Sequence, residues 1–181
     1  MRILIFLFSL LSLESQAQFQ PLNSYILKDF VILDSFSGDI NNDKIKDLVL
    51  ILKHNQEEDN FDTTRPLLLL EGNNQGLYRL MAKNDNVVLC KICGGVYGDP
   101  FEGITLENGG FTLDFRGGSR WRWTRHISFK FDKISSQFIL YKDIGIAYDG
   151  SNPEGKIDKK KYNKKDFGRL PFTKYNYEKE Y

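Results

Sequence analysis

Hydrophobic residues in the first half of the chain occur in short continuous runs. The run Leu48 to Leu52 contains only apolar residues, which is typical of a strand buried on both faces. A second run, Leu67 to Leu70, is followed by the turn-forming residues Asn73 to Gly76. Leu77 to Met81 then predicts a further strand, so this half is expected to form strands joined by polar loops.

The second half of the chain shows a clearer alternation of apolar and polar residues. Ile104 to Leu106 precedes Asn108-Gly109-Gly110, a strong β-hairpin signal, and Phe111 to Phe115 would form the returning strand. The longest alternation follows Gly118, and its inward face would carry Trp121, Trp123, Arg125, Ile127, Phe129 and Phe131. We therefore predict an antiparallel meander of about four strands over residues 103–149, with one face on the core.

These patterns predict a mainly β protein built from antiparallel sheets. Residues 18–150 would form a single β domain, because a chain of this length can bury one hydrophobic core. Asn, Pro, Gly and Lys dominate residues 151–181, which predicts a basic, extended C-terminal tail with little regular structure. Apolar residues of this tail would anchor it to the domain, namely Phe167, Leu170, Pro171 and Phe172.

Composition and charge restrict the classes of partner. The chain is 41% hydrophobic and 14% aromatic, which is typical of a globular protein. Its formal net charge of +1 provides no overall attraction to nucleic acid, so no nucleic-acid partner is expected. Acidic residues gather between Asp29 and Asp62 and lysines between Lys156 and Tyr181, and we interpret these as two solvated surfaces of a monomer.

The N-terminus carries the features of a secretory signal peptide. Met1-Arg2 is followed by the apolar run Ile3 to Leu13, and Ser15 and Ala17 occupy the small positions before a cleavage site. The run is too short to span a membrane, and no later segment approaches the ~20 apolar residues that a spanning helix needs. A buried N-terminal helix is the weaker alternative, because helix caps and amphipathic spacing are absent. We predict a signal peptide over residues 1–17 and a secreted or periplasmic protein.

The only two cysteines, Cys90 and Cys93, lie close together in the sequence VLCKICGG. In an oxidising compartment they are expected to form a small disulfide loop. A redox role would place the pair at a helix N-terminus, but glycines follow it here. A zinc site would need both His54 and His126 as further ligands, so a structural disulfide is favoured.

A crowded acidic stretch, GDINNDKIKDLVLIL, covers residues 38–52 and indicates a metal site. Alternate side chains of a tightly curled loop can converge on one point, and hard oxygen donors suit calcium. The predicted calcium ligands are the side chains of Asp39, Asn41, Asp43 and Asp47 and the backbone carbonyl of Ile45. The alternative is a turn rich in Asp and Asn that binds no metal.

An EF-hand is excluded because Lys44 occupies the glycine position and Leu50 the glutamate position. The order G-D-x-N-x-D-x-x-x-D-L-V-L instead resembles the calcium loop of FG-GAP or VCBS repeats, the blades of integrin-alpha-type β-propellers. The resemblance covers residues 34–81 in one copy, with RPLLLLEGNNQGLYRL similar to the second half of a repeat. One blade cannot bury its own faces, so a blade-like unit fused to the meander is expected rather than a complete propeller.

Two further stretches offer candidate chemistry. GGSRWRWTRH, residues 117–126, would suit a stacking surface or an anion site, although a core face backed by a solvated face explains it more simply. In the glycine-rich stretch CGGVYGDPFEGI, Asp99 and Glu102 are a possible acid–base pair. No sequence context for a nucleophile, a phosphate loop or a dinucleotide fingerprint is present.

Taken together, the sequence predicts an exported, calcium-stabilised binding module that recognises a protein or a glycan and is not an enzyme. A periplasmic inhibitor or immunity-type protein is the main alternative, since export and small size fit it equally well. A hydrolase that uses Asp99, Glu102 or the metal loop is the third hypothesis.

Overall fold

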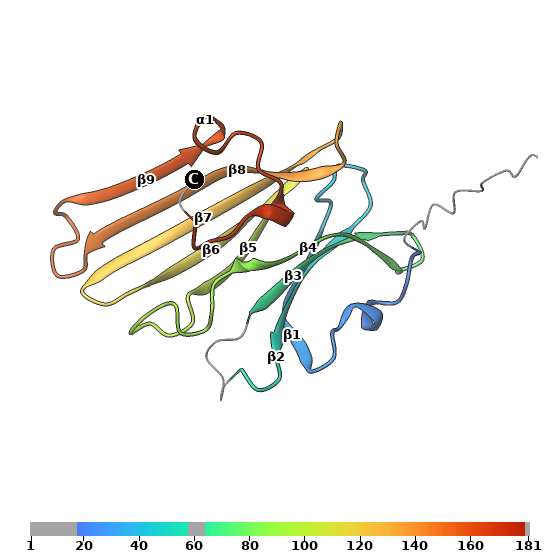
Figure 1. Ribbon diagram of the computed structural model, residues 1–181, viewed down its shortest axis with the longest axis horizontal. Helices are drawn as coiled ribbons and strands as arrows, with labels where there is room; N and C mark the ends of the chain where they lie inside the picture. Colours follow the sequence, from blue (N-terminus) through green and yellow to red (C-terminus); the bar gives the residue numbers. More distant parts are fainter. Residues whose placement is uncertain (1–17, 58–63, 180–181) are drawn as a thin grey trace, which may run out of the picture.

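The computed structural model describes residues 18–57 and 64–179, and this part of the chain folds mainly into strands, with 56% strand and 6% helix. The predicted signal peptide, residues 1–17, lies outside the described residues. Two antiparallel sheets pack against each other (Figure 1). The predicted fold class, mainly β with antiparallel sheets, is confirmed, and the described residues form no complete propeller.

The first sheet contains four strands in sequential order. They are β1 (Phe30–Gly38), β2 (Asp47–His54), β3 (Arg65–Gly72) and β4 (Tyr78–Val88), preceded by the short 3-10 helix η1 (Leu22–Tyr25). Every neighbouring pair is antiparallel, so residues 34–81, for which a blade-like unit was predicted, lie within one four-stranded antiparallel sheet. The sheet extends that unit in both directions, from Phe30 to Val88.

The second sheet contains the predicted meander and one strand that the sequence analysis did not expect. Its strands are β5 (Phe101–Glu107), β6 (Gly110–Gly118), β7 (Trp121–Asp132), β8 (Gln137–Asp149) and β9 (Ile157–Asn163), again in sequential order. Strand β9 pairs with β8 over seven residue pairs. The prediction of an extended tail with little regular structure over residues 151–181 is therefore wrong for this segment.

Burial on both faces explains the continuous apolar runs of β2 and β3. One set of their side chains packs toward the second sheet, and this set includes Val49, Ile51 and Leu69. The alternate side chains form a separate cluster on the other face, covered by residues of the N-terminal segment. Leu22, Tyr25 and Leu27 provide this cover, so the two central strands meet water on neither face.

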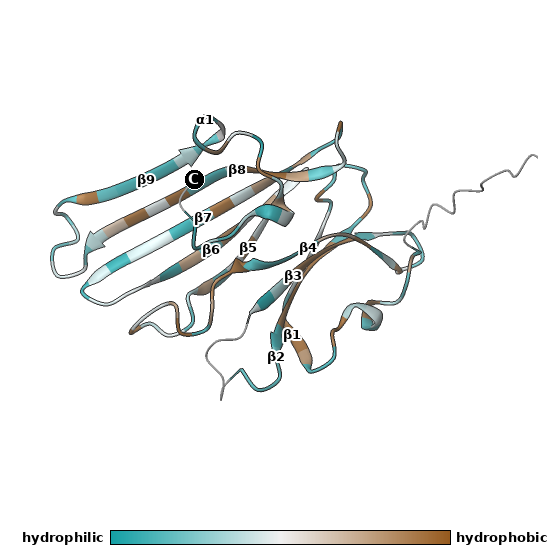
Figure 2. Cartoon of the chain, viewed as in Figure 1, coloured by the Kyte–Doolittle hydropathy of each residue, from teal (hydrophilic) through white to brown (hydrophobic). Residues whose placement is uncertain are grey.

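The second sheet has one face on the core, as the alternating pattern predicts. Ile127 and Phe129 on β7 are buried together with Phe111 and Phe115 on β6, and the hydropathy alternates along β7 and β8 (Figure 2). The core face does not extend to the start of β7, where Trp121 is 57% exposed. Placing Trp121 in the core was therefore wrong, because β7 continues past the aromatic cluster.

The chain after β9 returns to the core instead of extending into solvent. It passes through the four-residue helix α1 (Lys164–Phe167) and the 3-10 helix η2 (Phe172–Lys174). Phe172 and Tyr175 are fully buried, and their backbone carbonyls accept hydrogen bonds from the side-chain amide of Asn84. The predicted anchoring role of Phe172 is thus fulfilled by insertion into the core rather than by surface contact.

Replacing Phe172 with alanine is expected to lower the free energy of unfolding by about 3–5 kcal/mol, because it opens a cavity between aromatic rings. The ring centroid of Phe172 lies 5.2 Å from that of Phe129 and 6.0 Å from that of Phe111. Urea denaturation measures the change. Lys174→Ala in the same short helix is the exposed control and should change stability by less than about 0.5 kcal/mol. Equal effects of the two substitutions would contradict the inserted segment.

Candidate functional site

The predicted metal loop connects β1 to β2, and hydrogen bonds from its backbone N–H groups to its own side chains hold it in shape. The carboxylate of Asp39 accepts hydrogen bonds from the backbone N–H groups of Asn42, Asp43 and Lys44 at 2.6, 3.1 and 2.9 Å. Asn42 and Lys44 both have left-handed backbone conformations, with φ of 65° and 74°. A non-glycine residue in that region is uncommon, so the three hydrogen bonds to Asp39 stabilise a strained turn.

Asn41 and Asp43 also bond within the loop. The backbone N–H of Asp43 donates to the side-chain oxygen of Asn41 at 2.9 Å, and the Asn41 amide donates back to the Asp43 carboxylate at 2.9 Å. The second carboxylate oxygen of Asp43 accepts the backbone N–H of Ile45 at 2.7 Å. Each of these side-chain oxygens therefore has a donor inside the loop.

Asp47 fastens the loop to the first sheet. Its carboxylate is completely buried and accepts the backbone N–H groups of Ile40 and Gly72, both at 3.1 Å. Burial raises the pKa of Asp47 to about 6, with a smaller contribution from the nearby charge of Asp43. Gly72 must be a glycine here, because a Cβ atom would lie 2.0 Å from the backbone oxygen of Lys46.

The donor set of this loop matches calcium in chemical type. Asp39, Asn41 and Asp43 carry hard oxygens, and an oxygen that accepts one hydrogen bond keeps a second lone pair. Asp47 is a further carboxylate beside the loop. Burial raises its pKa, and a nearby cation would favour its charged form. In the described part of the chain, however, no three acidic, histidine or cysteine side chains are gathered as a metal centre.

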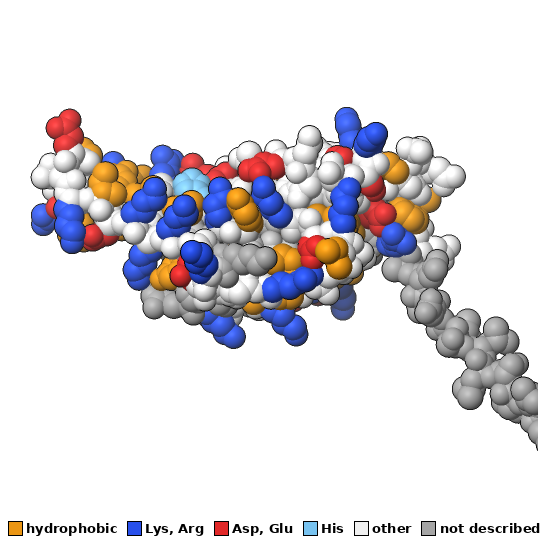
Figure 3. All heavy atoms as spheres, turned by 90° about the horizontal axis from the view of Figure 1, so that it is seen from above, with side chains coloured by type: hydrophobic (Ala, Val, Ile, Leu, Met, Phe, Trp, Pro, Cys, Tyr) orange, Lys and Arg blue, Asp and Glu red, His pale blue; other side chains and the backbone are white. Residues whose placement is uncertain are grey.

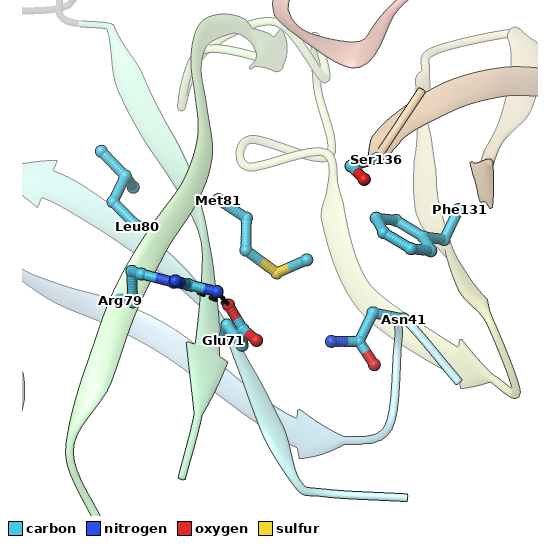
Figure 4. A pocket seen from close by; sticks show the side chains of 7 residues that line it. All are labelled: Asn41, Glu71, Arg79, Leu80, Met81, Phe131 and Ser136. Atoms are coloured by element: carbon cyan, nitrogen blue, oxygen red, sulfur yellow. Dashed lines mark hydrogen bonds and ion pairs between the residues drawn. The ribbon is translucent and has the colours of Figure 1, made fainter. Parts of the chain in front are cut away.

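A cavity of about 440 Å³ lies beside this loop, between the first sheet and the β7–β8 turn. Figure 4 shows Asn41, Phe131 and Ser136 on one side of it and Glu71, Arg79 and Met81 on the other. The carboxylate of Glu71 is paired with the guanidinium of Arg79. The two charges in the lining thus compensate each other, and the cavity presents no obvious site for a charged ligand.

A larger groove of about 560 Å³ lies on the inner face of the second sheet. Strand pairing aligns its floor in two rows, in which Trp123 lies opposite Ala147 and Arg125 opposite Gly145. Strand β9 extends both rows. Asp158 lies beside Ala147 in the first row, and Lys160 lies beside Gly145 in the second. The floor of the groove is open at Gly145, because a Cβ atom added there would meet no atom within 4 Å.

Aromatic side chains form the walls of this groove. Trp123 on β7 packs partly against the core, Tyr162 projects from β9, and Tyr177 comes from the C-terminal segment. Glu178 and Lys179 extend the same wall with one charge of each sign. The groove therefore combines aromatic walls, a floor of small residues and a nearly balanced set of polar groups.

A buried ion pair holds the C-terminal wall in place. Arg125 contacts the carboxylate of Asp143 through two nitrogens at 2.9 and 2.7 Å, and it donates to the backbone oxygen of Tyr177 at 2.8 Å. The hydroxyl of Tyr175 donates to the same carboxylate at 2.7 Å. Burial lowers the pKa of Arg125, but the contacts with Asp143 and the nearby phenols of Tyr175 and Tyr162 outweigh it and leave that pKa raised, so the guanidinium stays charged.

The loop between β4 and β5 is closed by a disulfide and hydrogen-bonded to β6. Cys90 and Cys93 are joined by a disulfide with their Cα atoms 5.2 Å apart. The loop lies against the end of β6, where the N–H of Gly118 donates to the oxygen of Gly94 at 2.8 Å. Glycine permits this approach, because a Cβ on Gly117 would lie 2.9 Å from the Cα of Gly94.

Asp99 and Glu102 are directed to different arginines instead of to a common site. Asp99 forms two contacts with the buried guanidinium of Arg65, at 2.8 and 2.6 Å, and Arg65 also binds Glu57. Glu102 pairs with Arg116 at 3.2 Å on the surface. The acid–base pairing considered for the hydrolase hypothesis is therefore not assembled, and Asp99 anchors the loop through Arg65.

The histidines likewise serve separate elements. His54 lies on β2, with its ring 5.4 Å from that of Phe30. His126 lies on the outer face of β7, with its Nδ1 atom 2.6 Å from a carboxylate oxygen of Asp114. The two histidines belong to different sheets, and the cysteines are bonded to each other, so the zinc alternative is not assembled.

Sequence reasoning missed the residues that β9 and the C-terminal segment contribute to the groove. Asp158, Lys160 and Tyr162 alternate along β9, but they alternate as polar residues, so hydropathy does not mark them as one face of a strand. Tyr177 lies in a segment without periodicity. The pairing of β9 with β8 brings Asp158, Lys160 and Tyr162 to the groove, and the hydrogen bond from Arg125 to its backbone oxygen brings Tyr177.

No protein-family model matches this chain, and no curated protein or solved structure does either. Within the part of the chain that the structure describes, no helix is long and apolar enough to cross a membrane.

Replacing Gly72 with alanine is expected to lower the free energy of unfolding by about 1–3 kcal/mol, because the added methyl group displaces the metal loop from β3. Gly145→Ala is the matched control, since its methyl group would enter open space. Both variants are unfolded in urea in the presence of a calcium chelator, which removes any metal contribution. A stability loss of the same size for Gly145→Ala would refute the close packing at Gly72.

Proposed function

We propose that this chain is an exported, non-catalytic binding module that recognises a glycan in the groove of its second sheet, acting as a monomer. The observation that supports this function is the combination of Trp123, Tyr162 and Tyr177 around the small residues Gly145 and Ala147. A sugar ring has an apolar face that packs on aromatic side chains and hydroxyl groups at its edge that need polar partners.

The charges of the groove favour a neutral ligand. Asp158 and Glu178 are balanced by Lys160 and Lys179, while Arg125 and Asp143 are paired with each other. A charged ligand would gain little from such a set, whereas hydroxyl groups can both donate to carboxylates and accept from ammonium groups. An uncharged oligosaccharide is therefore the ligand class that fits this lining.

Calcium binding remains part of the proposal, with a structural role. Asp39, Asn41, Asp43 and Asp47, with the carbonyl of Ile45, would hold the ion as in the FG-GAP or VCBS loops that the sequence resembles. The mutual repulsion of these carboxylates would then be compensated by the metal charge. The ion would stabilise the β1–β2 connection, which lies away from the residues of the groove.

An inhibitor or immunity-type protein is the second candidate function, and one observation favours it. The loop between β4 and β5 exposes Ile92, Val96 and Tyr97, of which Val96 is 84% exposed. A rigid loop that presents apolar side chains is suited to insertion into a partner protein. This candidate predicts that Val96→Asp abolishes partner binding, whereas the glycan proposal predicts no effect of that substitution.

Trp123→Ala and Gly145→Leu are expected to weaken binding of neutral oligosaccharides at least about tenfold, because the first removes a stacking surface and the second fills the floor. Binding is measured on an array of hexose and N-acetylhexosamine oligosaccharides and then by calorimetry. Trp121→Ala is the matched control, a tryptophan on the same face of β7 that does not line the groove.

The glycan proposal fails if no array oligosaccharide binds the native chain, or if Trp121→Ala weakens binding as much as Trp123→Ala. Turnover of a bound oligosaccharide would instead favour the hydrolase hypothesis.

Calcium at millimolar concentration is expected to raise the melting temperature relative to the protein in chelator, because an ion that binds only the folded state stabilises it. At a concentration about 100 times the dissociation constant, this gain is about 2.7 kcal/mol. Asp43→Ala should remove the shift, while Asp85→Ala, an exposed aspartate on β4, should keep it. An unchanged melting temperature without binding heat would show that the loop is a metal-free turn.

A further inference from the structure

The outer face of the second sheet carries a set of basic side chains that the proposed function does not use. Strand pairing aligns the outward residues Arg116, Thr124, Ile146 and Lys159 in one row. A neighbouring row contains His126, Ile144 and Lys161. The charged residues of both rows point away from the groove, because Arg125 and Gly145, which lie between the two rows along the strands, face into it.

A hollow of about 450 Å³ lies over β8 and β9 on this face, and every charged residue in its lining is a lysine. Lys142, Lys161 and Lys165 line it together with Tyr141 and Asn163. The ammonium groups of Lys130 and Lys142 lie 4.3 and 5.2 Å from the centroid of the Tyr141 ring. The aromatic ring thus holds two like charges near each other by cation–π contacts.

The other end of this face is held in a similar way by arginines. The guanidinium groups of Arg116 and Arg122 lie 5.8 and 5.7 Å from the centroid of the Tyr97 ring, which projects from the loop between β4 and β5. From Arg122 to Lys130 the strand β7 spans about 27 Å, at about 3.4 Å for each residue. The basic side chains therefore extend over a distance much longer than one small anion.

Few carboxylates compensate these charges. Glu102 pairs with Arg116, and Asp114 is engaged by His126 and by the hydroxyl of Thr105. Across the described residues, Lys130, Lys142 and Lys161 have no carboxylate partner. Seen from above, over the part of the molecule that contains β9, Figure 3 shows several lysine and arginine side chains with acidic ones among them. The net charge of +1 conceals this local excess.

We propose that the outer face of the second sheet, from Arg122 to the lysine hollow at Tyr141, binds an acidic polysaccharide. The charge and the length of the face both fit a chain that carries carboxylate or sulfate groups at intervals. Lysine is depleted in protein–protein interfaces, so a face lined by lysines favours a hydrated polymer over a folded acidic partner. This surface lies opposite the groove and does not depend on the function proposed for it.

The polymer binds by exchanging its counterions for lysine side chains, which makes its affinity depend on salt. The test measures binding of an oligomer of galacturonic acid by calorimetry at several salt concentrations, with its neutral methyl ester as the reference. The native chain should bind the acid form, bind the ester weakly, and lose affinity steadily as salt increases. The triple variant Lys130→Gln, Lys142→Gln and Lys161→Gln should bind about tenfold more weakly, at roughly 0.5 kcal/mol for each exposed contact.

The matched control is the triple variant Lys28→Gln, Lys46→Gln and Lys174→Gln, which loses the same charge at exposed sites outside this face. It should retain the affinity of the native chain for the acid oligomer. Equal losses in the two triple variants would overturn the proposal, because binding would then follow net charge alone.

Tighter binding to poly-glutamate, to duplex DNA or to vesicles of an anionic lipid than to the acid oligomer would also overturn it in favour of another partner class. Binding of neutral oligosaccharides by the groove variant Trp123→Ala is measured in a separate experiment. The proposal for the outer face and the proposal for the groove can therefore be refuted independently of each other.

Discussion

The insertion of Phe172 and Tyr175 between the sheets is the contact on which the rest of the architecture depends. Phe172 packs edge-on against Phe129, so an aromatic core that the two sheets share is completed by a segment from the end of the chain. The hydroxyl of Tyr175 reaches the buried carboxylate of Asp143 at 2.7 Å, and Arg125 pairs with the same carboxylate. A buried carboxylate of this kind is tolerated only when an opposite charge and hydrogen-bond donors surround it. The same tyrosine therefore closes the core and satisfies the ion pair that supports the groove wall.

The second sheet has two chemically different faces, because successive side chains along each strand point to opposite sides. Toward the first sheet, the aromatic core gives way to a groove with a glycine at Gly145 and balanced charges around it. On the opposite face the same strands present lysines and arginines arranged around Tyr97 and Tyr141. Because successive residues of a strand point to opposite sides, a change of one residue in register would exchange these two surfaces. The long pairing of β7 with β8 protects both surfaces against such a shift.

Local patterns predicted much of the fold correctly, and the errors have physical causes. The buried strands around Leu50 and Leu69 and the hairpin at Gly109 depend on neighbouring residues alone, and each occurs where it was expected. Strand β9 was missed because both of its faces meet solvent or the groove, so lysines fill it and no apolar alternation remains. Trp121 was assigned to the core because periodicity identifies a face of a strand but not how far the opposing layer extends.

Residue type and spacing were enough to predict the mainly β class, the strands that are buried on both faces, and the loop of oxygen donors between β1 and β2. Each of these depends on residue type and spacing within about a dozen positions, where steric and hydrophobic preferences act directly. Packing between distant segments pairs Asp99 with Arg65 rather than with Glu102, and it brings Tyr162 and Tyr177 to the same groove as Trp123. These relations join residues that are far apart in the chain. They exist only once strand pairing and the inserted C-terminal segment have closed the core.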